Sequence, residues 1–317
     1  MVKSVQGISV GVGGWGYLPV KQTNKLSLCA KLYDFVEVNS TFYKLPDEKL
    51  ARKWRASVPE KFQFSVRANH KLTHEQHLEP IEENFLEYER NLSICKILQA
   101  FVLHFQFPPS FEVTTQIVQG WRSFFSSVKK EAGLKYSIEV RNRNSLKNSL
   151  LQSFLMEYDI IPTSDPSRDK IQISAYSKIQ YSRVLGLGDH TKWSFSTGEL
   201  VQLKEKVSKT PATRRYVTFH NITMYEDGAR LKQMLDQEGN ELLAPVTGIG
   251  SLKQALVAEK LQYPISSHDL SSKLAWRTVV IEDGLRIHAN EITDRLSPNI
   301  QFESTEHILT ACERLFP

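Results

Sequence analysis

Hydrophobic and polar positions alternate over a short segment near the start of the chain. Val36 and Val38 alternate with Glu37 and Asn39, and strict alternation over so few residues predicts a β-strand. Because successive strand side chains point to opposite faces, Glu37 and Asn39 share one face and the two valines share the other. The segment therefore predicts a strand with a carboxylate and an amide on its polar face. This face either lines a site or simply meets solvent.

Strand-like segments recur along the chain, and most are separated by segments with apolar residues at three- and four-residue steps, as in helices. The further expected strands are residues 7–12, 62–67, 100–107, 136–141, 160–165, 181–187 and 215–221. The expected helices are residues 24–34, one beginning at Asp47, and 81–98, 112–128, 146–158, 199–207 and 227–235. Eight strands alternating with helices predict a (β/α)8 TIM barrel, and the alternative is a doubly wound open sheet.

The pattern changes near residue 240, where a polar stretch that begins at Gln237 is followed by glycine and proline residues. We therefore expect a barrel domain over residues 1–240 and a small, mostly helical domain over residues 245–317. Two adjacent short helices could also form a helix-turn-helix over residues 251–276.

Length and composition are those of a globular protein. The chain has 317 residues, of which 41% are hydrophobic and 24% charged, enough for a large α/β domain with a small second one. Cys29, Cys95 and Cys312 lie far apart, which predicts buried thiols in a reducing compartment. No signal-peptide core or apolar run of membrane-spanning length is present. We expect a cytoplasmic protein without a membrane partner.

The net charge of +5, with a pI near 8.9, is a mild basic excess. It permits an anionic ligand or nucleic acid, but it requires neither, because no dense block of Lys and Arg is present.

Several motifs resemble the YecE-like family, also known as domain of unknown function seventy-two. They are Gly14–Tyr17, Val36–Pro46, Phe62–Ala68 through His74, Phe105–Phe111, Glu139–Arg141, Thr163–Asp165 and Phe219–Asn221. The resemblance spans roughly residues 7–237 and implies a TIM barrel, but it implies no chemistry because the family has no settled activity.

The chain departs from the family pattern at three places. Leu18-Pro19-Val20 replaces a Trp-containing loop, and His220-Asn221 replaces an Asn-Asn pair. Arg67 stands where the family typically has Lys. Since Arg stays protonated, a role at position 67 is better assigned to anion binding than to a base or Schiff base.

In a barrel, the carboxyl ends of the strands converge on one mouth. Three carboxylates near strand ends are candidate acids or bases: Glu37, Glu139 and Asp165. The candidate substrate-binding residues are Trp15, Asn39, Tyr43, Arg67, Gln106, Arg141, Arg183, His220 and Asn221. Arginines suit phosphate or carboxylate groups. A structural ion pair between Glu139 and Arg141 is the alternative to a catalytic role for either.

Four aromatic residues, Trp15, Tyr17, Phe42 and Tyr43, lie on loops expected at the same mouth. They are suited to stacking on a sugar or base, and equally to apolar packing over the barrel.

No cofactor is predicted, although a divalent metal is possible. Glu37, Glu139, Asp165 and His220 could bind one, by analogy with barrel phosphoesterases. His70, His74 and His77 lack a recognised ligand spacing and also fit a surface helix. No phosphate-binding glycine motif or nucleophile elbow is present.

The leading hypothesis is an enzyme, a hydrolase or lyase, that acts on a small anionic or sugar-containing substrate by carboxylate acid/base chemistry. The alternatives are a nucleic-acid-binding protein or metal-dependent phosphoesterase, and a ligand-binding scaffold without catalysis. The sequence leaves the oligomeric state open.

Overall fold

The computed structural model describes residues 7–18, 24–142, 145, 148–189, 192–236, 246–275, 277–298 and 300–316. Contacts divide the chain into two compact units, the first built mainly from residues up to Val184 together with 205–219. The second comprises chiefly residues 185–204 and those from His220 onward. The predicted boundary near residue 240 lies outside the described residues.

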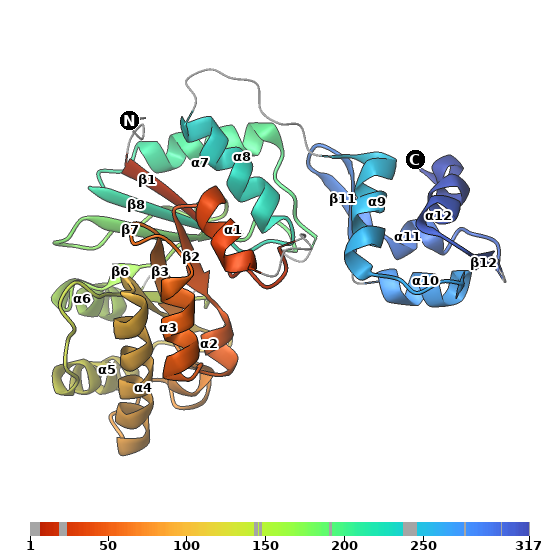
Figure 1. Cartoon of the computed structure of the whole chain (residues 1–317). Coiled ribbons are helices and arrows are strands. Elements are labelled where there is room, and N and C mark those ends of the chain that lie inside the picture. Colours follow the sequence, from red (N-terminus) through yellow and green to blue (C-terminus); the bar gives the residue numbers. More distant parts are fainter. Residues whose placement is uncertain are drawn as a thin grey trace. The chain divides into compact units, whose positions relative to one another are not determined.

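The first unit holds an eight-stranded sheet in the order β6-β5-β4-β3-β2-β1-β8-β7, in which neighbouring strands run parallel (Figure 1). A parallel bridge between Ser164 and Ser182 joins its two ends, so the sheet closes into the predicted barrel. The strands are β1 (Ile8–Val12), β2 (Phe35–Val38), β3 (Gln63–Arg67), β4 (Val102–Phe107), β5 (Lys135–Val140), β6 (Ile161–Pro162), β7 (Ile179–Val184) and β8 (Arg214–Phe219).

Helices alternate with these strands, as predicted. They are α1 (Lys25–Leu32), α2 (Ser40–Tyr43), α3 (Glu48–Ala56), α4 (Glu82–Leu98), α5 (Thr115–Ser127), α6 (Ser149–Glu157), α7 (Thr197–Ser208) and α8 (Met224–Asp236). Asp47 caps α3 by accepting a hydrogen bond from Leu50 N at 2.7 Å, which matches the expected helix start.

Two strands differ most in extent from the prediction. β6 is only two residues long. β7 ends at Val184 rather than residue 187, and Gly186 follows with a φ of +92° that leaves the extended conformation.

Apolar and aromatic side chains fill one layer of the barrel interior. Phe35, Tyr181 and Tyr216 are buried and pack together there. Phe35 lies edge-on to Tyr216, with ring centroids 5.6 Å apart. Since side chains two residues apart in a strand share a face, Glu37 follows Phe35 inward. The layer above the aromatic one is therefore polar.

The second unit contains the small C-terminal fold. Its helices are α9 (Gly248–Glu259), α10 (Ser267–Leu274), α11 (Asn290–Thr293) and α12 (Thr305–Cys312), with a 3-10 turn at Glu313–Leu315. Two small antiparallel sheets, which the sequence did not predict, pair β10 (Thr278–Glu282) with β11 (Leu285–His288), and β9 (Ile265–Ser266) with β12 (Gln301–Phe302). β9 separates the two helices of the helix-turn-helix interpretation.

Cys29, Cys95 and Cys312 are buried thiols, as predicted. Across the described residues, every helix is too short or too polar to cross a lipid bilayer.

Candidate functional site

A buried arginine connects two carboxylates inside the barrel. Arg183 Nη2 on β7 lies 3.0 Å from Oε1 of Glu37 on β2. Arg183 Nη1 lies 2.5 Å from Oε2 of Glu139 on β5. The exposed fraction of all three residues is below a tenth, and buried charges require such pairing. The strand ends thus bring together three residues that are far apart in the sequence.

A tyrosine also contacts Glu37, and a serine contacts that tyrosine. Tyr181 Oη donates to Glu37 Oε2 at 2.6 Å, and it lies 2.8 Å from Ser65 Oγ. Burial and the charge of Glu37 raise the pKa of Tyr181 well above its ordinary value. The phenol therefore stays protonated and remains a donor to the carboxylate at neutral pH.

Glu139 is held by two further side chains. Its Oε1 accepts from Arg141 Nε at 2.7 Å, and its Oε2 lies 3.3 Å from His104 Nε2. Burial raises the pKa of Glu139, but the charges of Arg183 and Arg141 and the hydrogen bond with His104 outweigh it and hold this pKa well below the ordinary value. Glu139 is therefore ionised at neutral pH. Burial lowers the pKa of His104, so its ring is neutral there.

Arg67 lies at the carboxyl end of β3 and is held differently from the other two arginines. Its Nη2 donates to Gln106 Oε1, and Gln106 Nε2 in turn donates to Phe107 O at 2.8 Å. The guanidinium lies over the ring of Phe42, with Cζ 3.7 Å from the centroid, a cation–π geometry. Its buried Nε has no hydrogen-bond partner among the described residues.

Arg67 experiences repulsion from its neighbours. Burial and the charge of Arg183 lower the pKa of Arg67 to about 10, although Glu37 and Glu139 act in the opposite direction. It remains protonated at neutral pH. The three guanidinium groups of this cluster face two carboxylates, which leaves a positive excess.

The remaining predicted residues of the first unit make contacts apart from the ion pairs of Glu37 and Glu139. Asn39 precedes α2 and its Nδ2 donates to Gly13 O at 3.1 Å. Asp165 Oδ1 accepts from the backbone N and the Oγ of Ser167 at 2.9 and 2.6 Å, which are bonds within its own loop. Trp15 packs edge-on against Trp54, with centroids 5.0 Å apart. Tyr43 is largely exposed beside Phe42.

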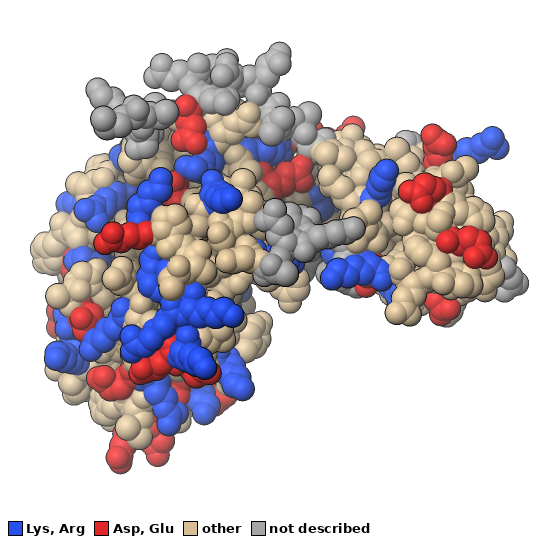
Figure 2. Space-filling view, viewed as in Figure 1, with Lys and Arg blue, Asp and Glu red and all other residues tan. Residues whose placement is uncertain are grey.

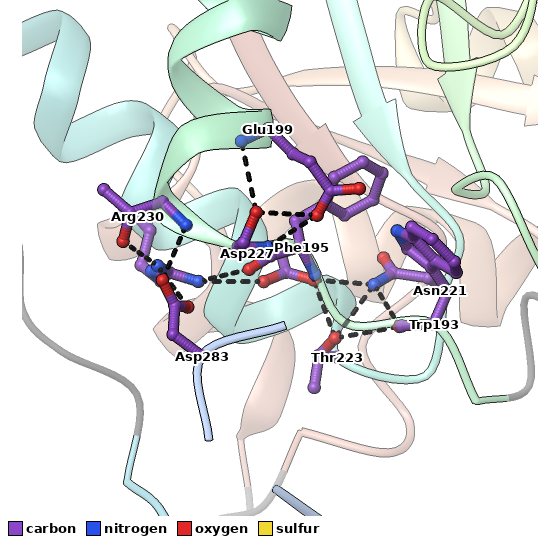
Figure 3. Close-up of polar contacts among 10 residues, drawn as sticks. Trp193, Phe195, Glu199, Asn221, Thr223, Asp227, Arg230 and Asp283 are labelled. Atoms are coloured by element: carbon purple, nitrogen blue, oxygen red, sulfur yellow. Dashed lines mark hydrogen bonds and ion pairs between the residues drawn. The ribbon is translucent and has the colours of Figure 1, made fainter. Parts of the chain in front are cut away.

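His220 and Asn221 belong to the second unit. Asn221 is buried, and its Nδ2 donates to Asp227 Oδ2 at 2.6 Å, Thr223 Oγ1 at 2.8 Å and Trp193 O at 2.9 Å (Figure 3). The structure therefore places Asn221 in a network that fixes the start of α8.

The same network continues to an aspartate and an arginine. Burial raises the pKa of Asp227 to about 6, although hydrogen bonds from Thr223 and Asn221 oppose the shift. Arg230 lies 3.5 Å from Asp227 and 3.1 Å from Asp283, in the turn that joins β10 to β11 (Figure 3).

The polar groups do not match a metal site well. In the part of the chain that the structure describes, no three His, Cys, Asp or Glu side chains are grouped to hold a metal ion. Arg183 lies between Glu37 and Glu139, so a cation shared by these carboxylates would have to displace the guanidinium. His70 pairs with Glu75 at 2.8 Å, whereas His77 packs against a different side chain, Phe111.

The sequence interpretation missed His104 and Tyr181 as cluster members. A signal was present, because each lies two residues before a predicted site residue, Gln106 and Arg183 respectively. Residues two apart in a strand share a face.

Comparison with known proteins matches the chain to one family. Residues 9–249 match the family model described as protein of unknown function DUF72. UPF0759 protein YunF of Bacillus subtilis strain 168 is 29% identical over 150 residues, which are 43% of this chain and 51% of that protein. This chain thus spans about half the length of that relative.

Two solved structures of the same family are similar in fold. A DUF72 family protein from Enterococcus faecalis V583 superposes with a TM-score of 0.59 and 19% identity, covering 76% of this chain and 99% of that one. One from Thermotoga maritima MSB8 has a TM-score of 0.59 and 19% identity, covering 73% and 99%.

Proposed function

The chain belongs to the family of proteins of unknown function DUF72, and from its side-chain geometry we propose that it binds a small anion at the mouth of its barrel. The ligand would carry a phosphate or carboxylate group, and it would contact Arg67 first. Arg141, which is half-exposed beside the cluster, is the second contact.

The observation that carries this proposal is the incomplete pairing of Arg67. A buried cation is costly unless its charge and its N–H groups are satisfied. Arg67 has an amide oxygen and an aromatic face as neighbours, but its Nε has no partner among the described residues. An anion beside the guanidinium would supply an opposite charge and offset the repulsion from Arg183.

Glu37 and Glu139 have a clear part in such a site, because they hold Arg183 and Arg141 in place. For acid/base chemistry Glu139 would act as a base, and its low pKa makes it a weak one. A ligand that draws Arg141 away from Glu139 would raise its basicity, which would link binding to catalysis. Asp165 needs no role in this proposal.

Sulfate binding to the full chain tests the proposal. Sulfate is titrated calorimetrically at constant ionic strength into the wild type and into Arg67→Gln. A charge-assisted hydrogen bond contributes about 1.5–3 kcal/mol, so we expect affinity to fall roughly 10- to 150-fold in the variant. Arg52→Gln, at an exposed arginine paired with Glu48, is the matched control and should bind as the wild type does.

The proposal fails if the wild type does not bind sulfate, or if Arg67→Gln binds it unchanged while keeping the wild-type circular dichroism spectrum.

A nucleic-acid-binding function is the second candidate, favoured by a different observation. Lys and Arg side chains gather on the face of the barrel around α3 (Figure 2). Lys49, Arg52 and Lys53 of that helix are exposed. Lys and Arg suit phosphate backbones without sequence preference. Nucleic-acid binding on this face does not involve Arg67. Loss of anion binding in Arg67→Gln would therefore favour the anion site at the barrel mouth over the nucleic-acid-binding function.

A further inference from the structure

The segment after β3 forms an unusual and well-anchored turn. Residues Lys71–Glu75 adopt a π-helical turn, a conformation often found at functional sites. Asn69 anchors it, because its Nδ2 donates to Thr41 O at 3.1 Å and its N donates to Asn91 Oδ1 at 3.1 Å. The backbone at the start of this turn is therefore held in place.

His74 is the residue that this turn brings toward the arginine cluster. Its ring centroid lies 4.8 Å from that of Phe42, the same ring that carries the guanidinium of Arg67. Burial and the charges of Arg67 and Arg141 lower the pKa of His74 to about 4. The imidazole is thus neutral at physiological pH, and the same charges that would attract an anion keep it so.

The neighbouring hydroxyl selects one tautomer of this ring. Thr73 Oγ1 lies 2.9 Å from His74 Nδ1, and Thr73 is almost fully buried. If Nδ1 carried the proton, the buried Thr73 hydroxyl would lack an acceptor for its own, which is costly. With Thr73 donating to Nδ1, the ring proton resides on Nε2. Nε2 makes no hydrogen bond with the residues that the structure describes.

We propose that His74 is a further ligand-contacting residue of the barrel mouth, whose Nε2–H donates to the bound anion and favours tetrahedral oxyanions. This inference rests on the proposed anion site. Arg67 at the end of β3, Arg141 directly after β5 and His74 on the π-helical turn are donors from three segments of the chain. A sulfate- or phosphate-like group offers more oxygens to such donors than a planar carboxylate does.

Two substitutions separate hydrogen bonding from packing. His74→Phe keeps an aromatic ring beside Phe42 but removes the donor, whereas His74→Gln replaces the ring with an amide that can donate. We expect His74→Phe to weaken sulfate binding about tenfold, which corresponds to the loss of one hydrogen bond to a charged group. We expect His74→Gln to stay within about threefold of the wild type. Formate binding should change little in either variant.

The outcomes are distinct. If His74→Phe binds sulfate as the wild type does while Arg67→Gln has lost binding, the anion site stands and the role of His74 is overturned. The role is also overturned if both His74 variants weaken sulfate and formate equally, since this is the pattern of a packing residue. If the wild type binds no sulfate, the anion site itself fails and this inference fails with it. Thermal unfolding of each variant confirms that the barrel is folded.

Discussion

Arg183 is the side chain on which the charged interior of the barrel depends. It is buried and contacts a carboxylate on β2 and another on β5. Without it, Glu37 and Glu139 would remain as two buried negative charges with fewer partners. Removing one member of a buried ion pair is far more costly than removing an exposed one.

Substitution of Arg183 by Met should therefore strongly destabilise the fold. We expect the free energy of unfolding, measured in urea, to fall by about 3–5 kcal/mol. Arg52→Met, at an exposed arginine on α3, serves as the comparison and should change stability by less than about 1 kcal/mol. Equal small effects in the two variants would mean that the cluster contributes little to stability.

For individual residues, the sequence indicated which charged side chains lie near one another. It did not indicate which hydrogen bonds and ion pairs they form. Glu37, Glu139 and Arg183 were expected near strand ends, and they are in contact. Asp165 was expected at the end of a strand, but β6 stops at Pro162. Asp165 lies beyond the ladder, where Ser167 provides two nearby donors. Such local competition for a carboxylate depends on backbone conformation that side-chain periodicity does not encode.

In the neighbouring strands β1 and β2, Gly11 lies directly against the ring of Phe35. A Cβ on Gly11 would lie 2.7 Å from three atoms of the Phe35 ring. The ring itself is enclosed by Phe101 and Tyr216. Gly11 therefore makes room for the aromatic layer beneath the charged residues.

Gly11→Ala should destabilise the barrel by about 1–3 kcal/mol, the usual cost of overpacking a core. Gly198→Ala is a suitable control because a Cβ there meets no atom within 4 Å. It should be neutral or stabilising in a helix. Adding Phe35→Leu to Gly11→Ala should restore part of the loss in urea unfolding. A Gly11→Ala protein as stable as the wild type would show that Phe35 can move at little cost.

The order of helices and strands was predictable because the barrel repeats a strand followed by a helix. Long helices such as α4 were close to their expected ranges, and β4 is buried along its whole length, as its apolar run predicted. The β10–β11 hairpin was missed. A signal was present, because Asp283-Gly284 lies between its two strands, and Asp-Gly between hydrophobic segments favours a hairpin turn.

For the molecule as a whole, the buried acids give opposite pH dependences of stability. Glu139 has a lowered pKa, so the stability it contributes is present above its unfolded pKa and is lost as the pH falls. Asp227 has a pKa raised from 3.8 to about 6. The stability linked to Asp227 is therefore complete at low pH and is lost as the pH rises from about 4 to about 6.

Asp227→Asn should remove this second dependence. The difference in unfolding free energy between the variant and the wild type should shift in favour of the variant by about 2 kcal/mol between pH 4 and pH 6.5. Urea unfolding at several pH values measures it. Asp236→Asn, at a more exposed aspartate of the same helix, should follow the wild type. Parallel curves for Asp227→Asn and wild type would contradict the raised pKa.

The contacts that Arg183 makes with β2 and β5 also constrain how the sequence can evolve. In the sheet, these two strands are separated by β3 and β4, so the arginine couples positions that no backbone ladder connects directly. A lineage that lost the arginine while keeping both acids would carry two uncompensated charges. Across descendants of a common ancestor, positions 37, 139 and 183 should accordingly be retained as a set or replaced as a set.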